Sequence, residues 1–223
     1  MTMIYGVSSN LEANLKLSNG FQTYDWIVRK NRFPQFWGRS IDGSCRIQRE
    51  EIEFLHGKNC RIALIYNGAT EEGACSLYGV EDGVCAVEAA QSLGVPSGEG
   101  YAIFAKIQPE WQVWENWIYG FAETVSEAGF VPGFIANTDS SINCSFDRSY
   151  NRFLEISREE DHFGCLVWAT EPKQEEPEVW MPFCPSDITP DQISLWQASS
   201  VECGGQPIEE NWLRNEEILQ YMW

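Results

Sequence analysis

The sequence predicts an α/β fold, because short apolar runs alternate with longer amphipathic ones along the chain. The apolar runs are continuous, which is typical of strands that are buried on both faces of a parallel sheet. One strand and one helix together take about thirty residues, as in a βαβ unit. These observations favour a (β/α)8-type TIM barrel, irregular or with fewer than eight strands, and the alternative is an open doubly wound sheet.

Seven segments are predicted to be strands, each rich in aliphatic and aromatic residues. They begin near Met3, Gln35, Arg61, Tyr101, Gly133, Gly164 and Ile193. No change of composition and no linker divides the first 170 residues, so we expect residues 1–223 to form a single domain. Residues 171–188 are rich in proline and acid and lack periodicity, which predicts a long loop after the sixth strand.

Five segments carry apolar residues at helical spacing. They are Gln48–Lys58, Val80–Leu93, Gln112–Ala128, Phe146–Glu160 and Ile208–Trp223. In the second segment Val80, Val84, Val87 and Ala90 share one face, which is predicted to be buried. The last segment is predicted to form a C-terminal helix within 207–223, because its large apolar residues share one side. Those residues are Ile208, Trp212, Leu219 and Trp223.

The charge of the chain excludes several classes of partner. Fifteen basic residues against 33 acidic ones give a net charge of −18, which repels phosphate backbones and anionic lipid headgroups. We therefore expect no nucleic-acid partner. The apolar runs are too short to cross a bilayer, so we expect no membrane insertion. The start of the chain, MTMIYGVSSN, has no secretion-signal pattern, and we expect a cytoplasmic or non-classically exported protein.

The sequence also lacks the common signatures of metal and cofactor sites. No two of its eight cysteines are closer than ten residues, and it has only two histidines, so no zinc-binding knuckle is present. It contains no phosphate-binding loop of the form GxxxxGK[ST]. We expect neither a metal nor a cofactor.

In a barrel of this type the chemistry lies where the parallel strands end. The residues at these ends are polar, rich in amides and aromatic, a mixture that suits the hydroxyls and apolar ring faces of a saccharide. The candidate ligand-binding residues are Ser8, Arg39, Tyr66, Asn67, Lys106, Trp111, Asn137, Trp168 and Gln197. Glycoside hydrolysis needs two carboxyl groups. The candidate catalytic acids are Glu110, Asp139 and Glu171, although in a chain with 33 acids surface carboxylates at loops are expected anyway.

Several sequence segments resemble one known family. They are FWGRS at 36–40, REEIEFLHGKNCRIALIYN at 49–67, GVEDGVCAVEAAQSLGVPSGEGYAIFAKI at 79–107, WIYGFAETVSEAGFVPGFIAN at 117–137 and LWQ at 195–197. They are similar to the glycoside-hydrolase-like barrels called domain of unknown function 1906, which are related to the family-25 lysozyme-type hydrolases. The resemblance implies a barrel fold over most of the chain.

The resemblance also implies acidic residues at three strand ends where this chain has Ser8, Asn67 and Ile107, whereas Arg39 matches the family. Serine and asparagine form hydrogen bonds but do not transfer protons near neutral pH. The sequence therefore predicts a degenerate hydrolase barrel that binds a saccharide or cell-wall fragment without efficient hydrolysis. The alternatives are an active muramidase-type glycosidase that uses displaced carboxylates such as Glu110, and a structural scaffold.

Overall fold

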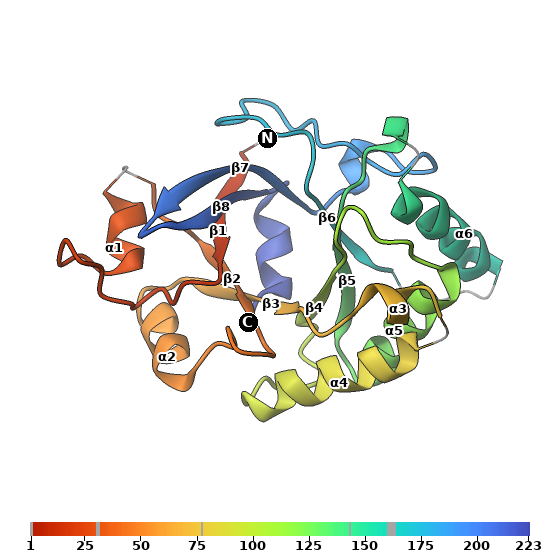
Figure 1. Ribbon diagram of the computed structural model, residues 1–223, viewed down its shortest axis with the longest axis horizontal. Helices are drawn as coiled ribbons and strands as arrows, with labels where there is room; N and C mark the ends of the chain where they lie inside the picture. Colours follow the sequence, from red (N-terminus) through yellow and green to blue (C-terminus); the bar gives the residue numbers. More distant parts are fainter. Residues whose placement is uncertain (1, 30–31, 77, 143, 160–163) are drawn as a thin grey trace.

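The centre of the protein is a closed barrel of eight strands that follow one another in chain order. The computed structural model describes residues 2–29, 32–76, 78–142, 144–159 and 164–223. The strands are β1 (Ile4–Ser9), β2 (Phe36–Ser40), β3 (Arg61–Tyr66), β4 (Ala102–Lys106), β5 (Val131–Ala136), β6 (Leu166–Ala169), β7 (Leu195–Cys203) and β8 (Gln206–Leu213). The first seven are parallel, whereas β8 runs antiparallel to both β7 and β1 (Figure 1). This confirms the predicted barrel, with eight strands and one of them reversed.

Helices cover the outside of the ring (Figure 1). They are α1 (Thr23–Val28), α2 (Arg49–Gly57), α3 (Glu71–Ala74), α4 (Gly79–Ser92), α5 (Glu115–Glu127) and α6 (Ser145–Glu159), with 3-10 turns η1 (Ser140–Ile142), η2 (Pro190–Gln192) and η3 (Glu216–Tyr221). All seven predicted strands and four of the five predicted helices are found. The loop predicted at 171–188 contains no helix or strand. Among the described residues, no helix is both long and apolar enough to cross a membrane.

The predicted C-terminal helix within 207–223 is wrong. Residues 206–213 form β8, and only 216–221 are helical, as η3. Ile208 and Trp212 lie four residues apart, a spacing that fits one face of a helix and one face of a strand equally well. The backbone of β8 pairs along its length with β1 and β7, so it closes the ring.

Aromatic side chains fill the inside of the barrel. The ring of Trp168 on β6 lies 6.2 Å from that of Phe36 on β2 and 5.4 Å from that of Phe104 on β4, measured between centroids. Glycines make room for these rings, since a Cβ at Gly6 would lie 2.2 Å from Phe36 and one at Gly133 would lie 2.4 Å from Phe104. The barrel is therefore a packed core with no channel through it.

The chain after β8 closes the end of the barrel at which the parallel strands begin. Ile218 and Met222 are buried among the inward-facing side chains of the strands. The backbone of Trp223 pairs with Ile62 at the start of β3, with N···O distances of 2.6 and 2.9 Å. In Figure 1 the violet turn of η3 lies within the ring of strands. The interior of the barrel is therefore closed at this end by the side chains of the tail.

Helices α4 and α5 pack closely through glycines, which corrects the buried face predicted for α4. A Cβ at Gly79 would lie 2.1 Å from the carbonyl oxygen of Trp117, and one at Gly83 would lie 2.7 Å from Thr124. The glycine side of α4 therefore faces α5. Of the predicted face, Val87 and Ala90 are buried, whereas Val80 and Val84 are 49% and 43% exposed.

Candidate functional site

A cavity of about 130 Å³ lies at the open end of the barrel. It is formed where β1, β2, β3 and β4 end and where the reversed strand β8 begins. We call it the mouth cavity. It is lined by Ser8, Ser9, Asn10, Ser40, Ile65, Asn67, Lys106, Pro207 and Glu209.

One wall of the mouth cavity is held by a buried amide. The side-chain Nδ2 of Asn211 donates a hydrogen bond to Oγ of Ser8 at 3.1 Å, and Oδ1 of Asn211 accepts one from Nε1 of Trp168 at 3.0 Å. Ser9 Oγ accepts the backbone N–H of Leu11 at 2.9 Å. Both serine oxygens thus act as acceptors within the protein, which leaves their hydroxyl hydrogens free to donate to a ligand.

The opposite wall is held by Asp42, which lies behind the lining residues. Its Oδ1 accepts the hydroxyl of Ser40 at 3.0 Å and the backbone N–H of Asn67 at 2.9 Å. The side-chain amide of Asn67 in turn donates to Oγ of Ser40 at 2.9 Å. These bonds fix the amide at the cavity surface with its carbonyl oxygen and second N–H available.

Glu209 is the one carboxylate among the described residues that line the mouth cavity. Its Oε2 accepts a hydrogen bond from Nε2 of Gln197 on β7 at 3.0 Å. Burial raises the pKa of Glu209 above the ordinary value of 4.5, while the charges of Lys173 and Lys106 and the bond from Gln197 act in the opposite direction. The sequence pattern does not single out Glu209, because it predicts a helix within 207–223. In the strand that forms instead, alternation with Ile208 and Glu210 places Glu209 inward.

Replacing Glu209 by glutamine is expected to stabilise the protein more at pH 7 than at pH 4. A carboxyl group whose pKa is raised on folding contributes stability at pH values below its unfolded pKa, and this contribution is lost as the pH rises through the folded pKa. The Gln variant has no such loss. Urea unfolding at both pH values measures the difference, and Glu202→Gln on the exposed surface of β7 is the matched control. An equal pH response in both variants would contradict the expected effect of burial.

Three of the predicted ligand-binding residues, Ser8, Asn67 and Lys106, lie together in the mouth cavity. Gln197 adjoins it through its bond to Glu209. Lys106 faces inward because Phe104, two residues before it on β4, also lies inside the ring.

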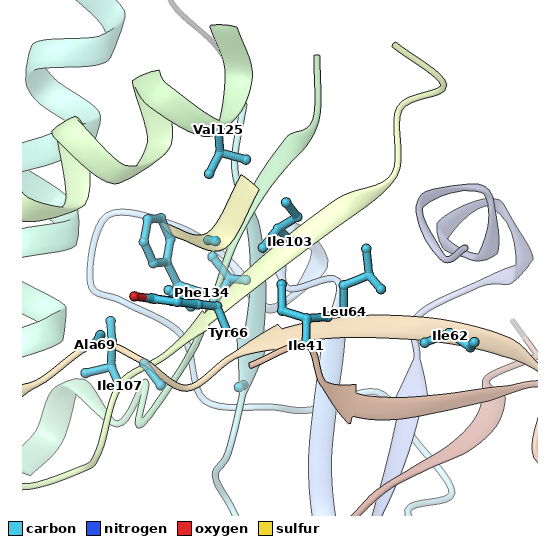
Figure 2. Close-up of a cluster of buried hydrophobic side chains, with 14 of the residues drawn as sticks. Ile41, Ile62, Leu64, Tyr66, Ala69, Ile103, Ile107, Val125 and Phe134 are labelled. Atoms are coloured by element: carbon cyan, nitrogen blue, oxygen red, sulfur yellow. The ribbon is translucent and has the colours of Figure 1, made fainter. Parts of the chain in front are cut away.

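Two other predicted residues point away from the mouth. Arg39 alternates outward on β2 and forms an ion pair with Glu51 of α2, in which Nε and Nη2 donate to the two carboxylate oxygens at 2.8 and 3.1 Å. Both side chains are 1% exposed. Tyr66 also faces outward, where its ring stacks on Phe121 of α5 and its hydroxyl donates to Asp82 at 3.0 Å. Figure 2 shows Tyr66 beside Phe134 in this outer cluster. Neither side chain reaches the cavity.

The remaining predicted ligand residues lie outside the lining. Trp168 is 0% exposed and lies in the barrel core, so its ring face is not available to a sugar. Trp111 is half-buried against the core outside the barrel. Oδ1 of Asn137 accepts the backbone N–H of Asp139 at 2.9 Å, which forms a turn after β5. None of the three aromatic residues among the predicted ligand-binding residues therefore lines the mouth cavity.

The three predicted catalytic acids do not line the mouth cavity. Glu110 is exposed in the turn after β4. Oδ1 of Asp139 accepts the N–H and the hydroxyl of Ser141 at 2.9 and 2.6 Å, which holds the start of η1. The backbone oxygen of Glu171 accepts the N–H of Phe183 at 2.9 Å within the long loop. In the described part of the chain, no three His, Cys, Asp or Glu side chains gather to hold a metal ion.

Neither a family model nor a curated protein matches this sequence. Solved structures do match in fold. An uncharacterized protein of B. stearothermophilus is 22% identical, with a TM-score of 0.79 over 99% of this chain and 100% of that one. The catalytic domain of an endolysin from bacteriophage P40 of Listeria monocytogenes is 14% identical, with a TM-score of 0.55 over 98% and 96%.

A bacterial lysozyme from Streptomyces coelicolor is 11% identical, with a TM-score of 0.53 over 99% of this chain and 97% of that one. The chain therefore shares its barrel fold with these proteins. At these identities the likeness concerns the barrel fold itself, and the chemistry of the mouth depends on the residues that line it in this chain.

Proposed function

We propose that the mouth cavity binds a saccharide, such as a cell-wall fragment, without hydrolysing it efficiently. The observation that carries the proposal is the lining of the cavity, where serine hydroxyls, an asparagine amide and a lysine surround the single carboxylate of Glu209. The same fold occurs in a phage endolysin and a bacterial lysozyme, which makes cell-wall saccharides the first ligands to test.

The free hydrogen-bonding groups of the cavity match a sugar. Ser8 and Ser9 offer hydroxyl hydrogens, since their oxygens already accept bonds from the protein. Asn67 offers both an acceptor and a donor, and Glu209 has Oε1 as an acceptor beside the bond that Oε2 receives. Each hydroxyl of a sugar donates one hydrogen bond and accepts others, so it is complementary to such a mixed surface.

The same groups are poor catalysts of glycoside hydrolysis. The reaction uses one carboxyl group as an acid and a second as a nucleophile or base. Ser8 and Asn67 stand at strand ends where the resemblance to the domain-1906 barrels implies acids, and neither side chain transfers protons near neutral pH. Glu209 provides one carboxyl group at the cavity, which supports binding over turnover.

Calorimetric titration with chitin-type and peptidoglycan-type oligosaccharides tests the proposal. We expect saturable binding, and Asn67→Ala is expected to weaken it by about 3–10-fold, the usual effect of losing one hydrogen bond. Gln91→Ala, which removes an amide from the exposed surface of α4, is the matched control and should bind like the parent. Absence of binding to every saccharide would overturn the proposal and favour the scaffold role.

The burial of Glu209 favours one competing function, an active hydrolase. A carboxyl group with a raised pKa is the kind of group that acts as a general acid. Reducing-sugar release should therefore be measured for the parent, Glu209→Gln and Glu110→Gln. We expect no release above the blank in any of them. Release by the parent that disappears in Glu209→Gln would replace the binding proposal with a hydrolase.

A further inference from the structure

Lys106 is the cationic residue among those that line the mouth cavity. It faces Ser8 and Ser40 across the cavity, because these residues come from β1 and β2 and Lys106 comes from β4. Its ammonium group makes no hydrogen bond or ion pair with the described part of the chain, and the side chain is half-buried. An ammonium group in such a place has donors available for a ligand.

The charge at the mouth differs from that of the whole chain. The protein has a net charge of −18, yet Lys106 and Lys173 both lie close enough to Glu209 to lower its pKa. Asp42 is the other acid near this wall, and its Oδ1 is occupied by Ser40 and Asn67. The lining thus presents one cation, Lys106, and one carboxylate, Glu209, to an incoming ligand, and Lys173 outside the lining adds a second positive charge nearby.

The free donors of the cavity outnumber its charged acceptors. The hydroxyls of Ser8 and Ser9 and the ammonium of Lys106 can all donate, whereas Glu209 offers one free carboxylate oxygen. Several donors around a cation are the arrangement that binds a carboxylate, because hydrogen bonds between charged groups are stronger than neutral ones. The carboxylate of Glu209 then remains as the acceptor for a hydroxyl of the same ligand.

We propose that the saccharide bound in the mouth cavity is an acidic sugar, and that Lys106 recognises its carboxylate. This inference rests on the proposed function and names the ligand class: a uronic acid or another sugar in which a carboxylate and hydroxyls lie on one ring. The cavity of about 130 Å³ is smaller than the roughly 300–1,000 Å³ of pockets that enclose drug-sized ligands, so it holds one ring of a longer chain or a single monosaccharide.

Matched sugars that differ only in the carboxylate test the inference. Methyl glucuronide is compared with methyl glucoside, and methyl galacturonide with methyl galactoside, by calorimetric titration at pH 7. We expect the acidic member of at least one pair to bind at least about tenfold more tightly, as for a hydrogen bond to a charged group. The advantage is expected to shrink as sodium chloride is added, because salt screens the attraction.

Variants assign the preference to Lys106. Lys106→Met should abolish the advantage of the acidic sugar, whereas Lys106→Arg should retain most of it. Lys58→Met, which removes the same charge at the end of α2 beside the start of β3, is the matched control and should bind like the parent. Glu209→Gln should strengthen binding of the acidic sugar, since it removes the negative charge nearest to the ligand. Thermal unfolding confirms that each variant is folded before titration.

The outcomes separate this inference from the proposed function. Equal binding of acidic and neutral sugars by the parent would overturn the inference and leave the proposed function in place. A preference that survives in Lys106→Met would overturn the assignment to this residue. Failure of both acidic and neutral sugars, together with the longer oligosaccharides, to bind would overturn the proposed function itself.

Discussion

Replacing Glu51 by glutamine is expected to lower the free energy of unfolding by about 3–5 kcal/mol. Glu51 and Arg39 are both 1% exposed, and the carboxylate also accepts the backbone N–H of Ala13 at 2.7 Å. The guanidinium of Arg39 donates further to the backbone oxygen of Ser9 at 2.6 Å. In the Glu51→Gln variant the positive charge of Arg39 would stay buried without its counter-ion. Urea denaturation monitored by tryptophan fluorescence measures the loss.

Two controls separate the buried charge from the packing around it. The double variant Arg39→Met/Glu51→Leu removes both charges and should regain much of the lost stability, because a buried pair is often no better than apolar residues of similar size. Glu53→Gln breaks an exposed pair with Arg49 on the same helix and should change stability little. If Glu51→Gln lowered the free energy of unfolding no more than Glu53→Gln, the ion pair would not hold α2 on the barrel.

Replacing Met222 by alanine is expected to cost about 2–5 kcal/mol of unfolding free energy. Met222 is 0% exposed and packs with the inward-facing side chains of the barrel at its closed end. Alanine would leave a void under these strands, and the surrounding β-barrel backbone cannot collapse into it. Deleting residues 214–223 should remove most of the stability, since natural domains have only about 5–15 kcal/mol in total. Chemical denaturation measures both.

Met222→Leu is the matched control for this prediction. It keeps the volume and the apolar character, so it should cost less than about 1.5 kcal/mol. The backbone bonds between Trp223 and Ile62 should persist in both Met222 variants, which places the difference on the side chain. A chain lacking 214–223 that unfolds at the same urea concentration as the parent would show that the tail does not seal the barrel.

The barrel and most of its elements could be predicted because continuous apolar runs and helical stripes repeat along the chain. The predicted C-terminal helix was wrong because the spacing of its apolar residues fits a helix and a strand alike. Ile208 and Trp212 suit a helix and a strand alike, and only the long-range pairing of this segment with β1 and β7 decides between them. In α4 the contacts of Gly79 and Gly83 set the buried face, and a rule that looks for large apolar residues does not detect them.

The candidate site was predictable in part, for a related reason. Position at the end of a strand identified Ser8, Asn67 and Lys106, which line the mouth cavity. Alternation along each strand then decides which side of the barrel wall a side chain faces, and it places Arg39 and Tyr66 outside. Glu209 could be found only after β8 was known to be a strand, because its inward direction follows from that assignment.

The reversed last strand also has a consequence for the order in which the fold can form. Ile4 pairs with Leu213 and Ser9 pairs with Ile208, so the ring is joined by residues that lie near opposite ends of the sequence. During synthesis from the N-terminus, β1 is made first. The edge of β1 that pairs with β8 stays unpaired until β8 has been made. Such distant pairing is slow and leaves an unpaired edge exposed to other chains. Nascent chains of this protein are therefore expected to depend on chaperones until β8 has emerged from the ribosome.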